Sequence, residues 1–273
     1  MFDPRINNTQ AGTMRAIQMA VAQGHHHYVS GEVPVERAQL LVQRFDERYQ
    51  LQMSQGQRDH ARRAGKATFR LVLWPVYDRV SFFWVLLRTD GSHPLLAMEQ
   101  WLDARGEKRI QWPWRYELVR TPVPKVLRDK YRRANGHVAI NAVTWTWRIQ
   151  PMEVERLKAL VRHIVHTRDG RMQQLIRGLA ISPGFRGIRD DVYKLFRYVE
   201  KRCAQHHRHE VVVPRSIFPI RSSVGRLVPF SVVMRRARAG KESWFPDVTA
   251  ASVRPPAEPL KAADTDSTPH QQE

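Results

Sequence analysis

The sequence predicts an α+β protein. Apolar residues follow helical spacing in residues 1–65, they alternate as in strands over 66–150, and helical spacing returns over 151–240. Residues 249–273 are rich in Pro, Ala, Ser and Thr and lack any apolar period. We therefore expect an N-terminal helical segment, a small antiparallel sheet, a basic helical unit and a disordered tail.

Positive charge dominates the composition. The 273 residues include 45 Lys and Arg against 26 Asp and Glu, a formal net charge of +19. Such a balance favours an anionic partner, either nucleic acid or a membrane surface. No run is as long and apolar as a membrane span, and the N-terminus lacks a signal-peptide pattern. We expect a cytoplasmic protein that binds nucleic acid and no membrane.

Cysteine usage restricts the chemistry further. Cys203 is the only cysteine of the sequence, which excludes an intramolecular disulfide and a cysteine-rich zinc site. Its place among the apolar positions of a predicted helix indicates a packing residue. No sequence pattern for a metal or a phosphate-binding loop occurs, so no metal and no cofactor are expected.

The N-terminal segment is predicted to contain two helices. The first spans about 13–23, and the second spans about 34–63, with Leu40, Leu41 and Phe45 on its core side. In the sheet region, 67–75 and 80–89 read as a β-hairpin, and 109–120 and 139–149 as two more strands. A short helix is expected over 95–104. Together these strands predict one antiparallel sheet of four.

The basic unit is predicted to begin with three helices, which start near Pro151, Asp169 and Gly187. The third has the clearest pattern, because apolar residues repeat along one side of it: Ile188, Val192, Leu195 and Val199. Two short strands, 210–213 and 227–234, then predict a β-hairpin. Three helices followed by a hairpin is the element order of a winged-helix domain, in which the third helix enters the major groove.

Basic residues concentrate in this unit. Residues 156–241 contain 20 Lys and Arg against 5 Asp and Glu, a net charge of +15. A polyanion is the favoured counterpart, and a solvated basic face without a partner is the alternative. The predicted nucleic-acid-binding residues are Arg186, Arg189, Tyr193, Arg197 and Lys201 of the third helix, Arg221 and Arg226 of the hairpin loop, and Arg128, Arg132 and Arg133 of the loop 126–136.

Two further patterns suggest contact with nucleic acid. Gly184–Gly187 precedes the third helix, where free backbone N–H groups are able to hold a phosphate. Trp145 and Trp147 alternate on a strand, as do Trp112 and Trp114, and bases stack on such platforms. Alternating aromatic residues more often belong to a core, and we favour that interpretation.

A histidine-rich segment offers an alternative function. His25, His26, His27 and Tyr28 are consecutive, and a histidine of near-neutral pKa is able to activate a ribose 2′-hydroxyl without a metal. The spacing matches no zinc motif. The simpler interpretation is that these side chains contact phosphate or solvent.

Several segments carry a resemblance to known proteins. They are Arg44–Tyr49, Tyr116–Arg120, Thr144–Arg148 and Pro183–Arg189. In them the chain resembles proteins of unknown function from proteobacterial plasmids and integrative conjugative elements, which implies a mobile-element setting. In its basic character and its His–Tyr segment it is also similar to Cas6-type CRISPR RNA endonucleases, which begin with a ferredoxin-like strand where this chain begins with helices.

These observations predict a nucleic-acid-binding accessory or regulatory protein of a mobile element, with DNA as the favoured target. The first alternative is a metal-independent RNA endonuclease that processes CRISPR RNA. The second is a protein-interaction subunit of a conjugation or effector complex, which docks through its Trp-rich sheet. The alternatives differ in where the functional residues lie: the third basic helix, the histidine segment or the Trp-bearing strands.

Overall fold

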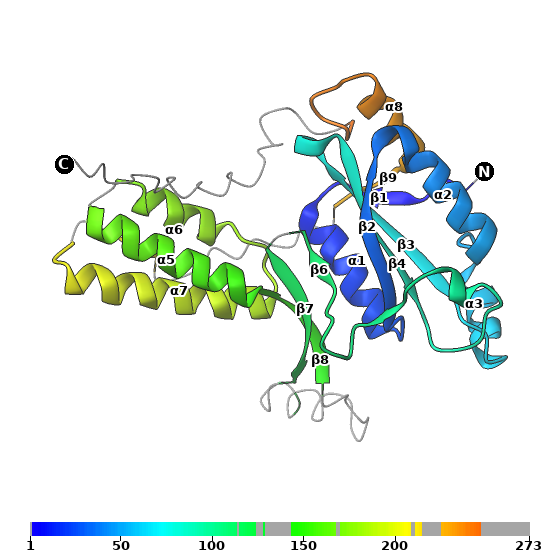
Figure 1. Cartoon of the computed structure of the whole chain (residues 1–273), viewed down its shortest axis with the longest axis horizontal. Coiled ribbons are helices and arrows are strands. Elements are labelled where there is room, and N and C mark those ends of the chain that lie inside the picture. Colours follow the sequence, from blue (N-terminus) through cyan, green and yellow to red (C-terminus); the bar gives the residue numbers. More distant parts are fainter. Residues whose placement is uncertain are drawn as a thin grey trace, which may run out of the picture.

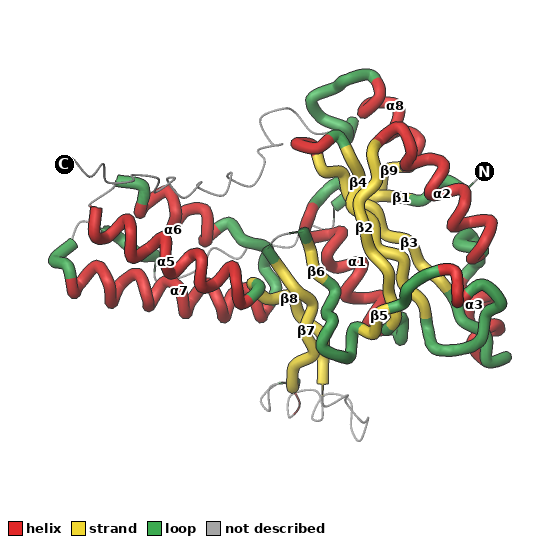
Figure 2. The backbone as a smooth tube through the Cα atoms, viewed as in Figure 1, coloured by secondary structure: helices red, strands yellow, loops and turns green. Residues whose placement is uncertain are grey.

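The computed structural model describes residues 2–113, 115–123, 128, 143–167, 170–208, 211–214 and 225–246. Helices and antiparallel sheets make up this part of the chain, which confirms the α+β class (Figures 1 and 2). The predicted tail, 249–273, lies outside the described residues.

A four-stranded antiparallel sheet forms one half of the molecule, in the order β3-β4-β2-β5. Its strands are β2 (His27–Pro34), β3 (Phe69–Val76), β4 (Ser81–Arg88) and β5 (Leu102–Asp103). Helix α1 (Gln10–Ala22) packs on one face and α2 (Val35–Tyr49) on the other (Figure 1). The predicted β3–β4 hairpin is confirmed. The sheet joins strands from both of the first two predicted regions, because β2 lies between β4 and β5.

The prediction of one helix over 34–63 is wrong. Pro34 ends β2, α2 ends at Gln50 in the left-handed conformation (φ 50°), and a separate helix α3 (Gln55–Arg63) follows. Ser54 begins α3, since its side chain and that of Gln57 bond each other's backbone N–H. Leu40, expected in the core, is 58% exposed, whereas Phe45 is buried.

The later strands of the region 66–150 form a second sheet rather than part of the first. It consists of β6 (Gln111–Trp112), β7 (Tyr116–Pro122) and β8 (Val143–Ile149), paired in that order. The prediction of a single four-stranded sheet is therefore wrong, because β2 supplies one of the two central strands of the first sheet and the later strands form a sheet of their own. The helix predicted over 95–104 is also wrong: it is reduced to a 3₁₀ turn, Leu96–Met98, followed by β5.

The three predicted helices of the basic unit are confirmed. They are α5 (Pro151–Thr167), α6 (Met172–Ala180) and α7 (Arg186–Gln205), and they project from the second sheet as a bundle (Figure 1). The predicted apolar stripe of α7 is buried. Cys203 is a buried free cysteine on α7, as expected of a packing residue.

The predicted hairpin after these helices is wrong. Residues 211–214 have no regular structure, and 227–234 divides into a short strand, β9 (Leu227–Pro229), and a helix, α8 (Phe230–Arg238). Strand β9 pairs with β1 (Arg5–Asn7), at the other half of the molecule. Helix α8 forms because its apolar residues recur at helical spacing and pack with Phe82 and Trp244. The winged-helix arrangement is therefore absent from the described residues.

One hydrophobic core connects the two halves. It runs from α1 and the first sheet through Trp112 and Trp147 of the second sheet to the buried faces of α5, α6 and α7. The basic helices are thus fixed to the sheet rather than joined to it by a free linker. Among the described helices, none is both long enough and apolar enough to span a bilayer.

Candidate nucleic-acid interface

The predicted basic face of α7 is presented to solvent. Arg189, Tyr193, Arg197 and Lys201 are all exposed, and each is one turn from the next. Lys194 is exposed beside them. The opposite side of α7 is buried against α5, α6 and β8. Over twelve residues at 1.5 Å per residue, the row from Arg189 to Lys201 extends about 18 Å.

Carboxylates in this unit are mostly engaged elsewhere. Glu153 pairs with Arg156 (2.6 Å) and Glu155 with Lys158 (2.8 Å), each within α5. Asp191 is buried and accepts from the Arg148 side chain of β8 (2.6 Å) and from the Ile149 N–H (3.1 Å). On α7, Asp190 and Glu200 are the exposed acids. The row of cations therefore keeps a positive excess.

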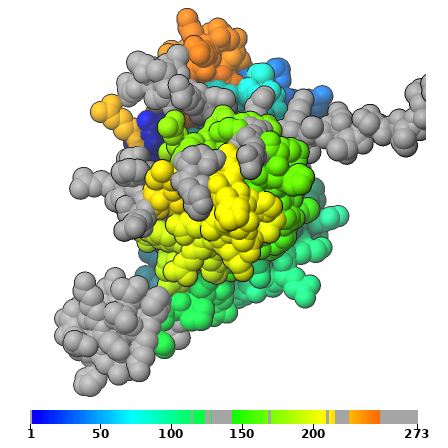
Figure 3. Space-filling model, turned by 90° about the vertical axis from the view of Figure 1, so that its left-hand side faces the viewer, coloured from blue at the N-terminus to red at the C-terminus, as the bar shows by residue number. Residues whose placement is uncertain are grey.

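Helix α5 extends the basic surface beside α7. The Arg162 guanidinium of α5 donates to the Tyr198 hydroxyl of α7 (3.2 Å), and His163 and His166 are exposed near the end of the same helix. Figure 3, which looks along the bundle toward the sheets, shows α5, α6 and α7 forming the surface nearest the reader. We call the exposed cations of α7, together with Arg162, the basic face. Sequence reasoning missed Arg162 and Lys194, although both lie in the same charge-rich window.

The start of α7 holds the helix against the second sheet. The Gly187 N–H donates to the Thr146 hydroxyl (3.1 Å), so it is not free to hold a phosphate. A Cβ at Gly187 would lie 2.6 Å from the Trp147 carbonyl oxygen, which explains the glycine. The Arg186 guanidinium donates to the Thr121 hydroxyl and to the Pro122 carbonyl (3.2 Å). Arg186 therefore anchors α7 to β7.

Of the other predicted basic residues, Arg226 and Arg128 lie in the described part of the chain. Arg226 is exposed, but it precedes β9, which pairs with β1 rather than with any element of the bundle. Arg128 is exposed. Arg132, Arg133 and Arg221 lie outside the described residues. The expected combination of the third helix with a hairpin loop is therefore not formed by Arg226.

The tryptophans belong to the core. Trp147 is fully buried, Trp112 and Trp145 are at most 8% exposed, and Trp114 lies outside the described residues. The Trp147 indole donates to the Met14 carbonyl of α1 (2.9 Å). The favoured interpretation is confirmed, and the three described side chains form no base-stacking platform.

Two residues of the histidine segment are structural. His25 is 1% exposed and its Nδ1 lies 3.1 Å from the Ala20 carbonyl oxygen. Burial, reinforced by the charge of Arg70, lowers the pKa of His25 to about 4, so it is neutral at pH 7. The buried Tyr28 donates its hydroxyl proton to the Arg109 carbonyl (2.9 Å), and burial raises its pKa to about 12. Neither group is placed for acid–base chemistry with a ligand.

His27 is more accessible and has a carboxylate partner. Its Nε2 lies 2.7 Å from Asp90 Oδ1, at the end of the sheet where β2 begins and β4 has ended. Arg105 bridges Asp90 and Asp103, and His26 Nδ1 lies 3.9 Å from Asp90 Oδ2. The hydrogen bond from His27 holds the pKa of Asp90 below its usual range. Sequence reasoning missed Asp90 and Arg105 because only strand pairing brings them to the histidines.

Metal ligation is not supported at this cluster. Within the described ranges, no group of three or more His, Cys, Asp or Glu residues has an arrangement that would hold a metal ion. The His27–Asp90 pair instead has the geometry of a histidine oriented by a carboxylate, which is an arrangement used for proton transfer.

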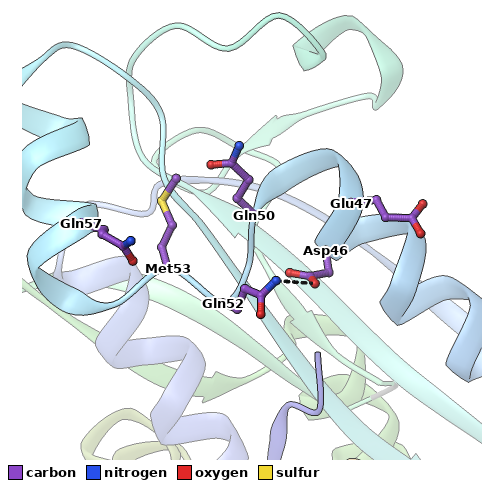
Figure 4. A pocket seen from close by; sticks show the side chains of 6 residues that line it. All are labelled: Asp46, Glu47, Gln50, Gln52, Met53 and Gln57. Atoms are coloured by element: carbon purple, nitrogen blue, oxygen red, sulfur yellow. Dashed lines mark hydrogen bonds between the residues drawn. The ribbon is translucent and has the colours of Figure 1, made fainter. Parts of the chain in front are cut away.

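A hollow beside the four-stranded sheet is lined in part by acidic residues, in contrast to the basic face. Its volume is about 520 Å³, and Figure 4 shows its lining around the end of α2 and the start of α3: Asp46, Glu47, Gln50, Gln52, Met53 and Gln57. The Gln52 amide donates to Asp46 (3.2 Å). Two carboxylates and no cation line this hollow, so it does not suit a phosphate.

Comparison of the chain with protein-family models, with curated proteins and with solved structures found no match. The candidate sites are therefore defined by the structure itself: a partly exposed network of histidines, carboxylates and Arg105 at the end of the first sheet, and the basic face on the helices.

Proposed function

We propose that this protein binds nucleic acid, with duplex DNA as the favoured target, through the basic face of α7 and α5. The observation that carries the proposal is the row of exposed cations on α7, where Asp191 is buried in an ion pair with Arg148 and the exposed acids are Asp190 and Glu200. Because such a face neutralises phosphates rather than reading bases, binding is expected to depend on salt more than on sequence.

The cellular role we propose is that of an accessory or regulatory factor of a mobile element, acting in the cytoplasm. Support for it comes from the resemblance of segments such as Thr144–Arg148 and Pro183–Arg189 to plasmid and conjugative-element proteins. The buried state of Trp112, Trp145 and Trp147 removes the surface that motivated a protein-docking role for the Trp-rich sheet.

The test compares two double variants of equal charge. Arg189→Ala/Arg197→Ala removes two cations from the basic face, and Arg37→Ala/Arg44→Ala removes two exposed cations from α2. If about six phosphates are neutralised, the wild-type log–log slope of affinity against salt is about −5. The first variant should bring it to about −3 and weaken binding about ten-fold or more, whereas the α2 variant should leave the slope near −5. Equal losses in both variants would contradict a defined interface.

A second candidate function is metal-independent RNA cleavage, favoured by the His27–Asp90 contact. His27 would take the proton of a ribose 2′-hydroxyl, and Asp90 would orient the imidazole. Incubation of a hairpin RNA in EDTA tests this function: cleavage lost in His27→Ala but kept in His163→Ala, an exposed histidine of α5, would establish it. Intact RNA with the wild-type protein would exclude it for that substrate.

A further inference from the structure

Three arginines gather where α3 meets the edge of the first sheet. Arg58 and Arg62 lie one turn apart on α3, and Arg70 lies on β3, the edge strand. Arg70 shares a face of β3 with Val72 and Trp74, which pack toward α1. The Arg62 guanidinium reaches the Gln23 carbonyl at the end of α1 (3.4 Å). All three side chains are half-buried, so solvent still reaches the cluster.

The positive charge of this cluster is poorly balanced. Asp59 pairs with Arg62, and Arg58 donates to the Leu51 carbonyl (2.9 Å). Within the described part of the chain, no hydrogen bond or ion pair is formed by the Arg70 side chain, and the Nε atoms of Arg58 and Arg70 are buried without acceptors. Three guanidinium groups therefore face one carboxylate.

The pKa values of these groups shift in the direction expected for cations held near one another. Burial lowers the pKa of Arg70 below its usual range, and the charges of Arg58 and Arg62 lower it further. Burial and the charge of Arg62 likewise lower the pKa of Arg58. His25, beside them, remains neutral for the same two reasons. Holding these like charges together therefore lowers the free energy of unfolding, and each buried donor without an acceptor lowers it further.

A bound anion would relieve the repulsion between these like charges. Guanidinium groups donate in a planar fork that matches phosphate oxygens, and arginine clusters are a recurrent way to bind phosphate. We propose that Arg58, Arg62 and Arg70 form a binding site for a phosphate group, separate from the basic face of α7. The phosphate belongs either to a small phosphorylated compound or to nucleic acid, and the site does not depend on the function proposed for α7.

The first experiment uses inorganic phosphate and the full chain. The melting temperature of the wild type should rise by about 3–6 °C at ten times the Kd of phosphate, relative to chloride at equal ionic strength. Arg70→Met, which keeps an apolar stem, should lose this shift. In phosphate-free buffer the same variant should melt at or above the wild-type temperature, because it removes an unpaired charge.

The matched control is Arg63→Met, which removes an exposed arginine from the same helix. It should keep the full phosphate-dependent shift. Arg58→Gln is a second variant of the site, on α3 rather than on β3, and should lose most of the shift. No shift in the wild type, or a full shift in both Arg70→Met and Arg58→Gln, overturns the proposal.

The source of the phosphate is tested with the basic face disabled. In the Arg189→Ala/Arg197→Ala background, a short oligonucleotide with a 5′-phosphate is compared with its 5′-hydroxyl form. Preference for the phosphorylated end, lost on Arg70→Met, identifies a terminal phosphate. Equal binding of both forms, weakened by Arg70→Met, identifies the nucleic-acid backbone. Binding unaffected by Arg70→Met, with the inorganic phosphate shift still lost, identifies a small phosphorylated compound. A failure of duplex binding by α7 leaves these results unchanged, so the two proposals fail separately.

Discussion

The two arginine-rich regions of this protein use the same side chain in opposite ways. On α7, Arg189 and Arg197 stand in an exposed row, with exposed acids nearby and with the buried carboxylate, Asp191, paired to Arg148. Around α3, Arg58 and Arg70 are half-buried, and their Nε atoms lack acceptors. Exposed arginines cost the fold little and suit a long ligand whose binding depends on salt. Half-buried arginines that share one carboxylate suit a single phosphate.

This difference shows that the burial of an arginine indicates the kind of ligand it binds better than the local density of charge does. The basic face was visible in the sequence because it lies on one helix and dominates the local charge count. The α3–β3 cluster contributes less net charge, but it is the region where charge is held at a free-energy cost. A test that affects one region and not the other separates the two roles.

The largest effect is expected from Trp147→Ala, which removes a central contact between the two halves. Trp147 is fully buried in the core that connects the first sheet to the bundle, and it donates to the Met14 carbonyl. We expect a loss of about 3–5 kcal/mol in the free energy of unfolding. Urea denaturation followed by far-UV circular dichroism measures it, with Met152→Ala, 80% exposed on α5, as a control that should change little. Two separate transitions in the wild type would show that the halves do not share one core.

Acid should destabilise the α3–β3 region through His25. Its pKa is about 4 in the folded protein, where burial and Arg70, Arg62 and Arg58 disfavour the proton, and about 6.5 when unfolded. Between these values the unfolded chain binds the additional proton, so stability present above pH 6.5 is lost as the pH falls, by about 3 kcal/mol in total.

The measurement for His25 is the free energy of unfolding between pH 7 and pH 5, where the wild type should lose about 2 kcal/mol from this residue. His25→Gln should remove most of that loss, and His163→Gln, on the exposed side of α5, should not. His26 and His93, whose pKa values burial also lowers, add a residual slope of the same sign. An unchanged profile in His25→Gln would contradict a buried neutral His25.

A smaller loss of stability is expected from Asp191→Ala, at the junction of α7 and β8. The substitution leaves the Ile149 N–H without its acceptor and the Arg148 side chain without its carboxylate. Because Arg148 is partly exposed, we expect a loss of about 2–3 kcal/mol rather than the full value of a buried pair. Asp190→Ala, its exposed neighbour, should cost far less in the same urea experiment and should slightly strengthen DNA binding. Equal losses in both variants would contradict the anchoring role of Asp191.

Local periodicity was sufficient to predict the helices of the basic unit. Val192, Leu195 and Val199 are buried as their spacing indicates, and the exposed row on the other side of α7 follows from the same period. Strand β2 was missed because Gly31 and Pro34 are poor strand residues. These residues form a strand because they pair with β4 and β5. Gly31 is needed there because a Cβ would lie 2.9 Å from the Trp84 side chain.

The other errors also have a tertiary cause. Residues 230–234 alternate enough to resemble a strand, but packing of Phe230, Val233 and Met234 on the core around Phe82 selects a helix. The arginine cluster was missed because Arg70 reaches Arg58 and Arg62 only after a turn and a change from helix to strand. The four-residue spacing of Arg58 and Arg62 was the available signal, and it resembles an ordinary solvated helix face.

The smallest effect, and the sharpest separation of the two regions, is expected from Ser54→Ala. Ser54 Oγ accepts from the Gln57 N–H (3.3 Å), and Gln57 Oε1 accepts from the Ser54 N–H (2.7 Å), so this pair holds the start of the helix that carries Arg58 and Arg62. Loss of the cap costs about 1 kcal/mol, which should quicken hydrogen exchange of the α3 amides about five-fold.

Because the phosphate site depends on α3 and the basic face does not, Ser54→Ala should reduce the phosphate-dependent rise in melting temperature and leave duplex DNA affinity unchanged. Ser54→Asn, which preserves an N-cap acceptor, should restore both the slow exchange and the phosphate shift. The contrary outcome is that Ser54→Ala weakens DNA binding as strongly as it weakens phosphate binding. In that case the cluster around Arg70 and the row on α7 belong to one continuous surface that binds one ligand, rather than to a half-buried site and an exposed site with separate ligands.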